Sequence, residues 1–196
     1  MLCWRQFVVF ARNFLRHPLT VGTFAPSSPF VVRQLLGQID WVSARTVVEY
    51  GPGVGTITAA MLRRMRPDAR LLAIETNAEF VRFMREHIRD PRLTVRQGAA
   101  AEVLRMLEES GLGPADCIVS GIPFSTMPEH RRRQTLAATA QALAGGGRLV
   151  VYQWTQSVLP HLDGLFEVVD EAVEWRNLWP MRLFLCEKPA PEVGRD

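Results

Sequence analysis

Apolar positions along this chain fall into two alternating patterns, short continuous runs and longer segments with helical spacing. The runs that predict strands are residues 46–50, 71–75, 93–97, 117–120 and 148–153. The segments whose spacing predicts helices are residues 56–65, 78–89, 101–109 and 131–144. Gly145 to Gly147 are predicted to end the last of these helices. Strands that alternate with helices predict a parallel sheet covered on both faces by crossover helices.

The pattern changes after Gln153, where two further extended segments follow. Residues 165–175 and 181–187 both read as strands, with the turn-prone residues 177–180 between them. We therefore expect a terminal β-hairpin whose last strand is antiparallel within the sheet. The predicted fold is an α/β, Rossmann-like sheet of seven mostly parallel strands with helices on both faces. We divide the chain into an N-terminal amphipathic helix and cap segment, residues 1–40, and a main domain, residues 41–196.

A glycine-rich turn follows the first predicted strand. Glu49 and Tyr50 lead into Gly51-Pro52-Gly53-Val54-Gly55, and a helix is predicted to begin at Thr56. Glycines at such a turn let a ligand approach the backbone at the carboxyl edge of the sheet, where open α/β sheets bind ligands. Glu75 ends the next predicted strand, where its carboxylate can accept both hydroxyls of a ribose.

Two details distinguish this turn from a dinucleotide site. The glycines are spaced G-x-G-x-G and not G-x-G-x-x-G, so the fingerprint of a pyrophosphate-binding turn is absent. Glu49 would repel a pyrophosphate but could bind the cationic amino-acid end of S-adenosylmethionine. The sequence therefore predicts S-adenosylmethionine as the cofactor and S-adenosylhomocysteine as its product. A turn with a purely structural role is the alternative.

The third predicted strand leads into a loop where the adenine edge of this cofactor is expected. A side-chain carboxylate often binds adenine there, but this chain has Gly98, Ala99 and Ala100. We therefore expect backbone N–H groups, foremost that of Ala99, to take this role. The predicted cofactor contacts are Ser27, Ser28, Glu49, Tyr50, Gly51, Pro52, Gly53, Gly55, Glu75, Thr76, Gly98, Ala99, Ala100 and Ser120.

The fourth predicted strand ends in Ser120-Gly121-Ile122-Pro123-Phe124, the predicted catalytic loop. Its position resembles the N-P-P-Y type of loop in methyltransferases that act on amino nitrogens. Methyl transfer to an amine mainly requires the lone pair to be held in line, which acceptor groups around Ser120 can do. The ring of Phe124 can face the developing ammonium, a contact worth about 0.5–2 kcal/mol. Because an apolar pocket favours the neutral amine, we expect no dedicated general base. A simple tight turn is the alternative.

Residues 2–17 sort into an aromatic face and an arginine face at helical spacing. Trp4 and Phe7 lie on the apolar face, and Arg5, Arg12 and Arg16 lie on the other. This pattern is typical of a helix lying in a membrane interface, so these residues are predicted to contact an anionic membrane surface. A helix packed on its own domain is the alternative, and the two interpretations are compatible.

Composition limits the class of protein and its partners. Apolar residues make up 47% and charged residues 22%, which is typical of a globular chain. A net charge of +3 is too mild to require nucleic acid as a partner. Cys3, Cys117 and Cys186 are scattered, so we expect no disulfide framework and no metal site. With no apolar stretch long enough to span a bilayer, we expect a cytoplasmic protein, and a monomer.

These motifs together resemble the bacterial phospholipid N-methyltransferases, which are class I S-adenosylmethionine-dependent enzymes. The resemblance covers nearly the whole chain. The segments that carry it are residues 14–18, 21–29, 48–55, 119–124, 153–155 and 176–180, with Glu75. The most specific of them are Pro26-Ser27-Ser28 and the loop from Ser120 to Phe124.

The resemblance implies stepwise methylation of the headgroup amine of phosphatidylethanolamine towards phosphatidylcholine, at the inner face of the cytoplasmic membrane. It implies a phospholipid substrate, no metal, and an N-terminal helix that docks on anionic lipid. The residues to which it gives cofactor roles are Glu49, Gly51, Gly53 and Glu75, and the candidates for the lipid phosphate are Arg16, Arg176 and Arg182. Three positions depart from the family pattern: Tyr50 replaces an aliphatic residue, Ala99 an aspartate and Trp179 a proline.

Other functions fit parts of the same pattern. An RNA adenine N6-dimethyltransferase has a similar core, but it would normally have an RNA-binding domain, a more basic surface and an asparagine at the start of the acceptor loop. A methyltransferase acting on a soluble amine, or on another aminolipid of the ornithine type, is also compatible. A non-catalytic membrane-binding protein that keeps only the fold is the alternative from a different class.

Overall fold

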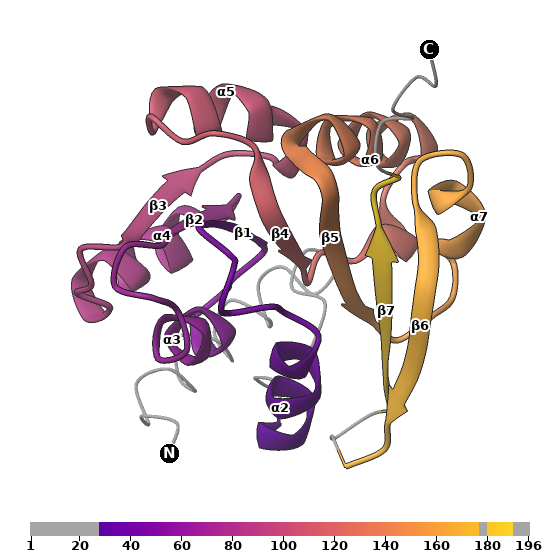
Figure 1. The fold of residues 1–196 in the computed structure, drawn as a ribbon, viewed down its shortest axis with the longest axis horizontal. Coiled ribbons are helices and arrows are strands. Elements are labelled where there is room, and N and C mark those ends of the chain that lie inside the picture. The colour runs from indigo at the N-terminus through magenta and orange to yellow at the C-terminus, as the bar shows by residue number, and fades with distance from the viewer. Residues whose placement is uncertain (1–27, 177–179, 190–196) are drawn as a thin grey trace.

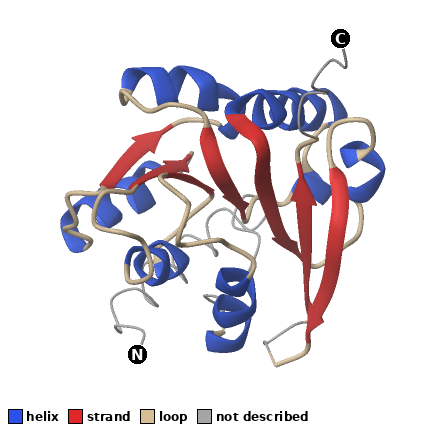
Figure 2. Cartoon of the chain, viewed as in Figure 1, coloured by secondary structure: helices blue, strands red, loops and turns tan. Residues whose placement is uncertain are grey.

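One mixed sheet forms the centre of the molecule, in a computed structural model that describes residues 28–176 and 180–189 (Figures 1 and 2). Its seven strands lie in the order β3-β2-β1-β4-β5-β7-β6. The strands are β1 Thr46–Tyr50, β2 Arg70–Glu75, β3 Leu93–Gln97, β4 Ala115–Ser120, β5 Leu143–Gln153, β6 Glu167–Glu174 and β7 Met181–Glu187. β7 is antiparallel to both β5 and β6, and the other neighbouring pairs are parallel. The predicted sheet and its terminal hairpin are confirmed.

Helices cover both faces of this sheet. They are α2 Pro29–Gly37, α3 Thr56–Leu62, α4 Ala78–His87, α5 Val103–Glu109, α6 Glu129–Ala142 and α7 Leu159–Leu162, with short 3-10 turns η1 Ala100–Glu102 and η2 Phe124–Thr126. α5 and α6 lie on one face, and α2, α3 and α4 lie on the other (Figure 1). The predicted helix over residues 2–17 lies outside the described residues.

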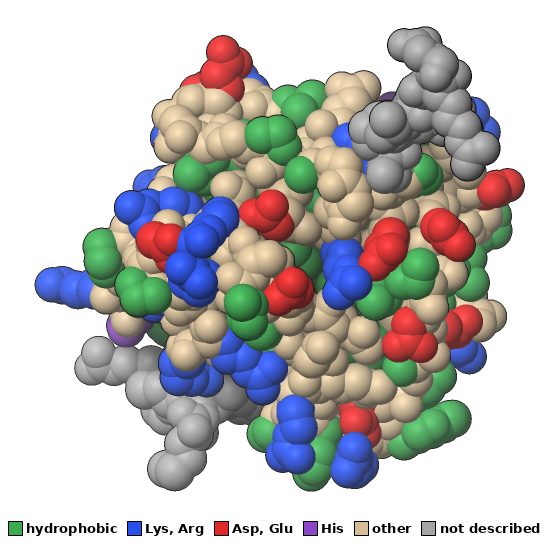
Figure 3. Space-filling view, viewed as in Figure 1, with side chains coloured by type: hydrophobic (Ala, Val, Ile, Leu, Met, Phe, Trp, Pro, Cys, Tyr) green, Lys and Arg blue, Asp and Glu red, His purple; other side chains and the backbone are tan. Residues whose placement is uncertain are grey.

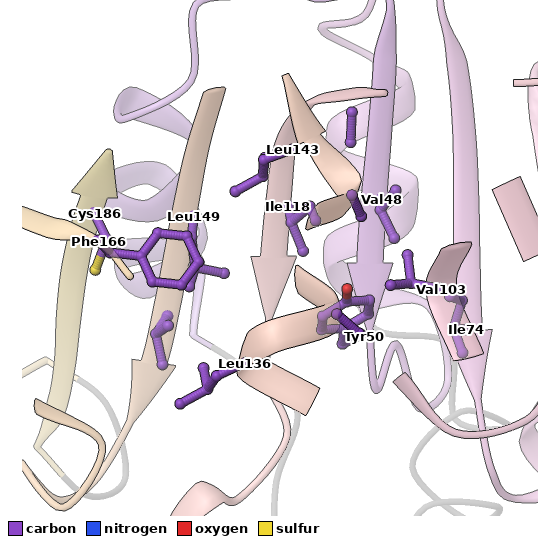
Figure 4. Close-up of a cluster of buried hydrophobic side chains, with 14 of the residues drawn as sticks. Val48, Tyr50, Ile74, Val103, Ile118, Leu136, Leu143, Leu149, Phe166 and Cys186 are labelled. Atoms are coloured by element: carbon purple, nitrogen blue, oxygen red, sulfur yellow. The ribbon is translucent and has the colours of Figure 1, made fainter. Parts of the chain in front are cut away.

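The two faces of the sheet bury separate clusters of side chains. Val48, Ile118 and Leu149 point towards α5 and α6, where they pack with Leu136 (Figure 4). Their strand neighbours, such as Val47, point the other way and pack against α2 and α3. Successive residues of a strand face opposite sides, so strands covered on both faces need apolar residues throughout. This explains why the strands appear in the sequence as continuous apolar runs.

The predicted end of the last crossover helix is wrong. The helix expected over residues 131–144 ends at Ala142, and Gly145 to Gly147 lie inside β5 and do not cap the helix. Leu143 already pairs with Ala115 of β4, and the register shifts before Arg148 pairs with Cys117. The glycines therefore form an irregular first part of the strand, where Gly146 has a φ of +73°.

The carboxyl ends of β1, β4, β5 and β6 lie at one edge of the sheet. β6 reaches this edge because it runs antiparallel to β7, which itself runs antiparallel to β5. α2, which the sequence analysis did not identify as a helix, contacts β6. Ser28 caps it by accepting the backbone N–H of Val31, and Pro29 follows at the first helical position. The same edge therefore joins the predicted cofactor turn, the predicted catalytic loop and the end of the hairpin.

Candidate active site

The glycine turn after β1 has the conformation that its sequence demands. Gly51, Gly53 and Gly55 have φ values of +68°, +56° and +78°, a region that residues with side chains rarely adopt. A Cβ atom on Gly51 would lie 3.0 Å from Cγ2 of Ile122, which belongs to the predicted catalytic loop. The turn after β1 and the loop after β4 are therefore in direct contact, as their shared edge of the sheet predicts.

Glu49 is fully buried at the end of β1. Its Oε2 accepts a hydrogen bond of 2.5 Å from the hydroxyl of Thr58 on α3, and its Oε1 has no partner among the described residues. Burial raises the pKa of this carboxyl to about 8, with the Thr58 hydrogen bond acting in the opposite direction. A buried carboxylate with a free oxygen needs a cationic partner, so this position fits the ammonium group of an amino-acid ligand.

Glu75 connects the end of β2 with the glycine turn. Its Oε2 accepts the N–H of Gly53 at 3.0 Å, and its Oε1 accepts the N–H of Asn77 at 2.9 Å. The hydroxyl of Thr76 donates to the same Oε1 at 3.3 Å. Burial raises the pKa of Glu75, and these donors oppose that effect. Oε1 thus has two donors and Oε2 only one, so Oε2 can still accept a ribose hydroxyl while Glu75 holds the turn.

The loop after β3 differs from the expectation for adenine. The N–H of Ala99 donates to Oε2 of Glu102 at 2.9 Å, and that of Gly98 donates to the carbonyl of Glu75 at 3.0 Å. The Ala99 N–H is thus held by a side chain of its own chain. Its adenine contact, like that of Ala100, stays a prediction. Glu102 has the spacing of the acidic residue in a capping box, but Ala99 has no side chain to complete the box, so the sequence signature is absent.

Two side chains of the predicted catalytic loop, those of Ser120 and Phe124, are buried and not exposed at the candidate site. Ser120 is fully buried and pairs with Tyr50 and Val151, so its side chain lies on the α5 and α6 face. Its Oγ has no partner among the described residues. The ring of Phe124 is fully buried in the cluster on the same face. The cation–π role of Phe124 therefore stays a prediction that the position of its ring does not favour.

Two residues at the end of β5 were missed by the sequence analysis. A Cβ atom on Gly121 would lie 2.1 Å from the hydroxyl oxygen of Tyr152, so this phenol lies directly over the catalytic loop. Gln153 is buried, and its Oε1 lacks a partner among the described residues. The signal for both was present: a polar pair ends an otherwise apolar strand at the carboxyl edge of the sheet.

Other predicted residues lie elsewhere. Tyr50 points into the core, where its hydroxyl lies 3.2 Å from that of Thr139 on α6. Pro52 is buried within the glycine turn. Ser28 caps α2. Ser27 and the predicted membrane contacts Trp4, Arg5, Phe7, Arg12 and Arg16 lie outside the described residues.

Arg176 lies beside a pocket of about 480 Å³ between α2 and the end of β6. It forms two hydrogen bonds with Glu174, of 2.9 and 3.0 Å, and its guanidinium lies 4.4 Å from the centre of the Phe30 ring. Arg33 also lines the pocket, and the neighbouring Trp175 is 73% exposed. Basic and hydrophobic side chains gather over α2 and the end of β6, at the lower edge of the view in Figure 3.

The described part of the chain lacks two features. Within it, no three histidine, cysteine or acidic residues are grouped as a metal ion would require. None of the helices found there has the length and apolar character needed to cross a bilayer.

Comparisons with known proteins agree with this geometry. Residues 47–147 match the family of methyltransferase domains. The chain is 30% identical to the ornithine lipid N-methyltransferase of Singulisphaera acidiphila over 186 residues, which cover 93% of this chain and 96% of that protein. It is 27% identical to the ribosomal RNA small subunit methyltransferase A of Aromatoleum aromaticum, over 59% of this chain and 37% of that protein.

A solved structure with the same fold is the N-methyltransferase NodS of Bradyrhizobium japonicum in complex with S-adenosylhomocysteine. It superposes with a TM-score of 0.70 and covers 92% of this chain and 99% of its own. The two sequences are 16% identical, so this likeness concerns the fold alone.

Proposed function

Because this chain belongs to the class I S-adenosylmethionine-dependent methyltransferases, we propose that it methylates the amine of a lipid headgroup. S-adenosylmethionine, when bound, supplies an electrophilic methyl group, and S-adenosylhomocysteine is the product. Glu49 would hold the ammonium of the cofactor and Glu75 its ribose, with the glycine turn between them. The free Oε1 of Glu49 and the positive φ angles of the turn fit this assignment.

The observation that carries the lipid acceptor is the extent of the match to the ornithine lipid N-methyltransferase. That match covers nearly all of both chains, including the segments outside the general methyltransferase domain. The match to the ribosomal RNA enzyme covers 37% of that protein, so most of that enzyme's length lies outside the match. The match to the ornithine lipid N-methyltransferase also favours an ornithine-type aminolipid as the substrate over phosphatidylethanolamine, the lipid that the resemblance implied.

The chemistry at the ends of β4 and β5 supports an amine as the acceptor. The uncharged hydroxyl of Tyr152 lies over the catalytic loop there, whereas the hydroxyl of Ser120 is buried on the opposite face of the sheet. A hydroxyl over the loop can accept a hydrogen of an amine and orient its lone pair. An amine that enters in its neutral form needs no base before the transfer, and partial desolvation favours that form.

The surface around α2 supports approach of a lipid. Phe30 and Trp175 expose aromatic rings beside Arg33 and Arg176, at the edge of the sheet that carries the catalytic loop. Aromatic rings next to cationic side chains are typical of segments that lie at a membrane interface. We propose that Arg176, despite its ion pair with Glu174, takes part in this contact together with the predicted N-terminal helix, and that the protein is peripheral to the cytoplasmic membrane.

The test of the acceptor uses purified protein, labelled S-adenosylmethionine and anionic liposomes. Three sets of liposomes contain an ornithine lipid, phosphatidylethanolamine or neither, and the extracted lipids are separated on a plate. We expect label in the methylated ornithine lipid. Label only in derivatives of phosphatidylethanolamine would contradict the ornithine lipid and identify a phospholipid as the substrate. No labelled lipid, from protein that binds the cofactor, would leave a methyltransferase with a different acceptor.

The membrane contact has a separate test. Neutralising Arg5, Arg12 and Arg16 together should abolish binding to anionic liposomes while leaving cofactor affinity intact, because their predicted contact is with anionic headgroups. The matched control removes the same charge at the opposite edge of the sheet, from Arg45, Arg66 and Arg70, and should bind liposomes normally. Unchanged liposome binding by the first variant would refute the role of the N-terminal helix.

A further inference from the structure

Tyr152 is the part of the candidate site that neither the motifs nor the cofactor chemistry accounts for. It is the second-last residue of β5, and it packs with the cluster on the α2 and α3 face of the sheet. Ser120 points to the opposite face, so the two hydroxyls at the ends of β4 and β5 do not share one pocket. Tyr152 lies on the same face of the sheet as Val150, next to the glycine turn and the catalytic loop.

The phenol of Tyr152 occupies the space that a side chain at position 121 would fill. A Cβ atom on Gly121 would lie 2.1 Å from its hydroxyl oxygen and 2.4 Å from the adjoining ring carbon. Gly121 is not among the glycines with positive φ, so its backbone would tolerate a side chain. A side chain at position 121 would therefore have to displace the phenol of Tyr152. Residues 121–124 of the catalytic loop have no polar side chain, and Tyr152 brings a hydroxyl to this point.

The surroundings of the Tyr152 hydroxyl are those of a group directed at a ligand. It has no hydrogen-bond partner among the described residues, although the ring is half-buried. Burial raises the pKa of Tyr152, and the charges of Glu49 and Glu75 raise it further, so the hydroxyl stays protonated. Tyr152 lies on the same face of the sheet as Glu49, because Glu49 pairs with Val119 and Val119 pairs with Val150, two residues before Tyr152. A neutral phenol oxygen in this position keeps its lone pairs free to accept a hydrogen bond.

We infer that the hydroxyl oxygen of Tyr152 accepts a hydrogen bond from the acceptor amine and so directs the lone pair of its nitrogen towards the transferred methyl group. In the reaction the nitrogen forms a bond to the methyl carbon while the bond from that carbon to sulfur breaks. Sulfur keeps the electron pair, and the new ammonium later releases a proton to water. Tyr152 exchanges no proton with the amine and serves to position it. This inference rests on the proposed amine acceptor and is independent of which lipid carries the amine.

The direct test compares two cofactor analogues by calorimetry, without any turnover. Sinefungin carries a primary amine where the cofactor carries its methyl-bearing sulfonium, whereas S-adenosylhomocysteine carries an uncharged sulfur there. Tyr152→Phe should lose roughly tenfold in affinity for sinefungin, because a hydrogen bond to a charged donor is lost, and keep its affinity for S-adenosylhomocysteine. An equal loss for both ligands would place Tyr152 at the end that they share. No loss for either would remove it from the site.

A matched control separates this effect from general stability. Thr139→Val removes the hydroxyl paired with the other tyrosine of the chain, Tyr50, on the opposite face of the sheet. It should lower the melting temperature without changing the ratio of the two affinities. If Thr139→Val shifts that ratio as much as Tyr152→Phe does, the effect is structural and the inference fails.

The position of the phenol has its own test, which needs no ligand. Gly121→Ala should lower stability in the wild-type background, since the new methyl group meets the phenol. In a Tyr152→Ala background, the same substitution should cost much less. An equal loss in both backgrounds would show that Tyr152 does not lie over Gly121. Absence of lipid methylation would refute the proposed function alone, because neither the affinity ratio nor this cycle depends on a lipid.

Discussion

The two halves of the active-site edge are built on different principles. At the ends of β1 and β2, Glu49 and Glu75 are ionisable and buried, and the backbone around them is fixed by glycines and by N–H groups bound to a carboxylate. At the ends of β4 and β5 the polar side chains are uncharged. Oγ of Ser120 and Oε1 of Gln153 lack a partner among the described residues, and the phenol of Tyr152 lies over the catalytic loop.

This difference follows from what each half has to bind. A cofactor with a fixed shape and a permanent ammonium group is matched by carboxylates held rigidly before binding. An amine that must be neutral to react is better served by oriented oxygens that do not stabilise its charged form. Cofactor binding at the ends of β1 and β2 thus depends on charge, whereas binding of the amine at the ends of β4 and β5 depends on the position of uncharged oxygens.

Glu49→Gln should weaken binding of S-adenosylhomocysteine by about 10–100-fold, because it removes a charged hydrogen-bond acceptor from the ligand ammonium. It should also make the ligand-free protein at least as stable as the wild type at pH 8, since a buried charge is costly without its partner. Calorimetry and thermal unfolding measure the two effects. Unchanged affinity would mean that the ammonium is bound elsewhere.

Ionisation of Glu49 should lower the stability of the ligand-free protein but raise its affinity for the cofactor, so the two quantities should depend on pH in opposite directions. Because the pKa of Glu49 is raised to about 8 in the ligand-free protein, the contribution of Glu49 to stability is fully present below its ordinary value of 4.5 and is lost as the pH rises through about 8. Cofactor affinity should instead rise by up to about tenfold per pH unit between pH 6 and 8, as the carboxylate ionises. Glu49→Gln should flatten the binding profile, so a slope that persists in this variant would assign the titration to another group.

Gly51→Ala tests the contact between the two halves. It should destabilise the protein by about 1–2 kcal/mol through the left-handed backbone alone, and further through the contact of its Cβ with Ile122. Gly111→Ala is the matched control, because Gly111 also has a positive φ, of +64°, but has open space around it. Denaturant unfolding of both variants isolates the contact. Equal losses of stability in Gly51→Ala and Gly111→Ala would show that the Cβ at position 51 makes no unfavourable contact with Ile122.

Thr58→Val should have the smallest effect. The Thr58 hydroxyl lowers the pKa of Glu49, so its removal should move the binding profile to higher pH and weaken binding a few-fold at pH 8. Thr56→Val serves as the control, because the Thr56 hydroxyl on the same helix is buried without a partner among the described residues. A shift of the profile in Thr56→Val of the same size would contradict the specific role of Thr58.

Local signals in the sequence were sufficient for most of the fold. β1, β3 and β7 begin and end where the apolar runs predicted, because strands buried on both faces must be apolar throughout. The glycine turn and the two carboxylates after β1 and β2 were likewise evident, since a tight turn and a charged ligand require particular residue types at particular places. The first part of β5 was not evident, because its glycines favour a helix end locally and the pairing of Leu143 with Ala115 overrides that preference.

The sequence by itself therefore determined the order of the elements, the class of cofactor and the loops that meet at the carboxyl edge. Tertiary structure decided which side chains face that edge. It turned Ser120, Tyr50 and Phe124 into the core, gave the Ala99 N–H to Glu102, and brought Tyr152 over Gly121, about thirty residues away in the chain. The physical reason is that a strand has two faces, and which of them a ligand meets depends on the helices that cover the other.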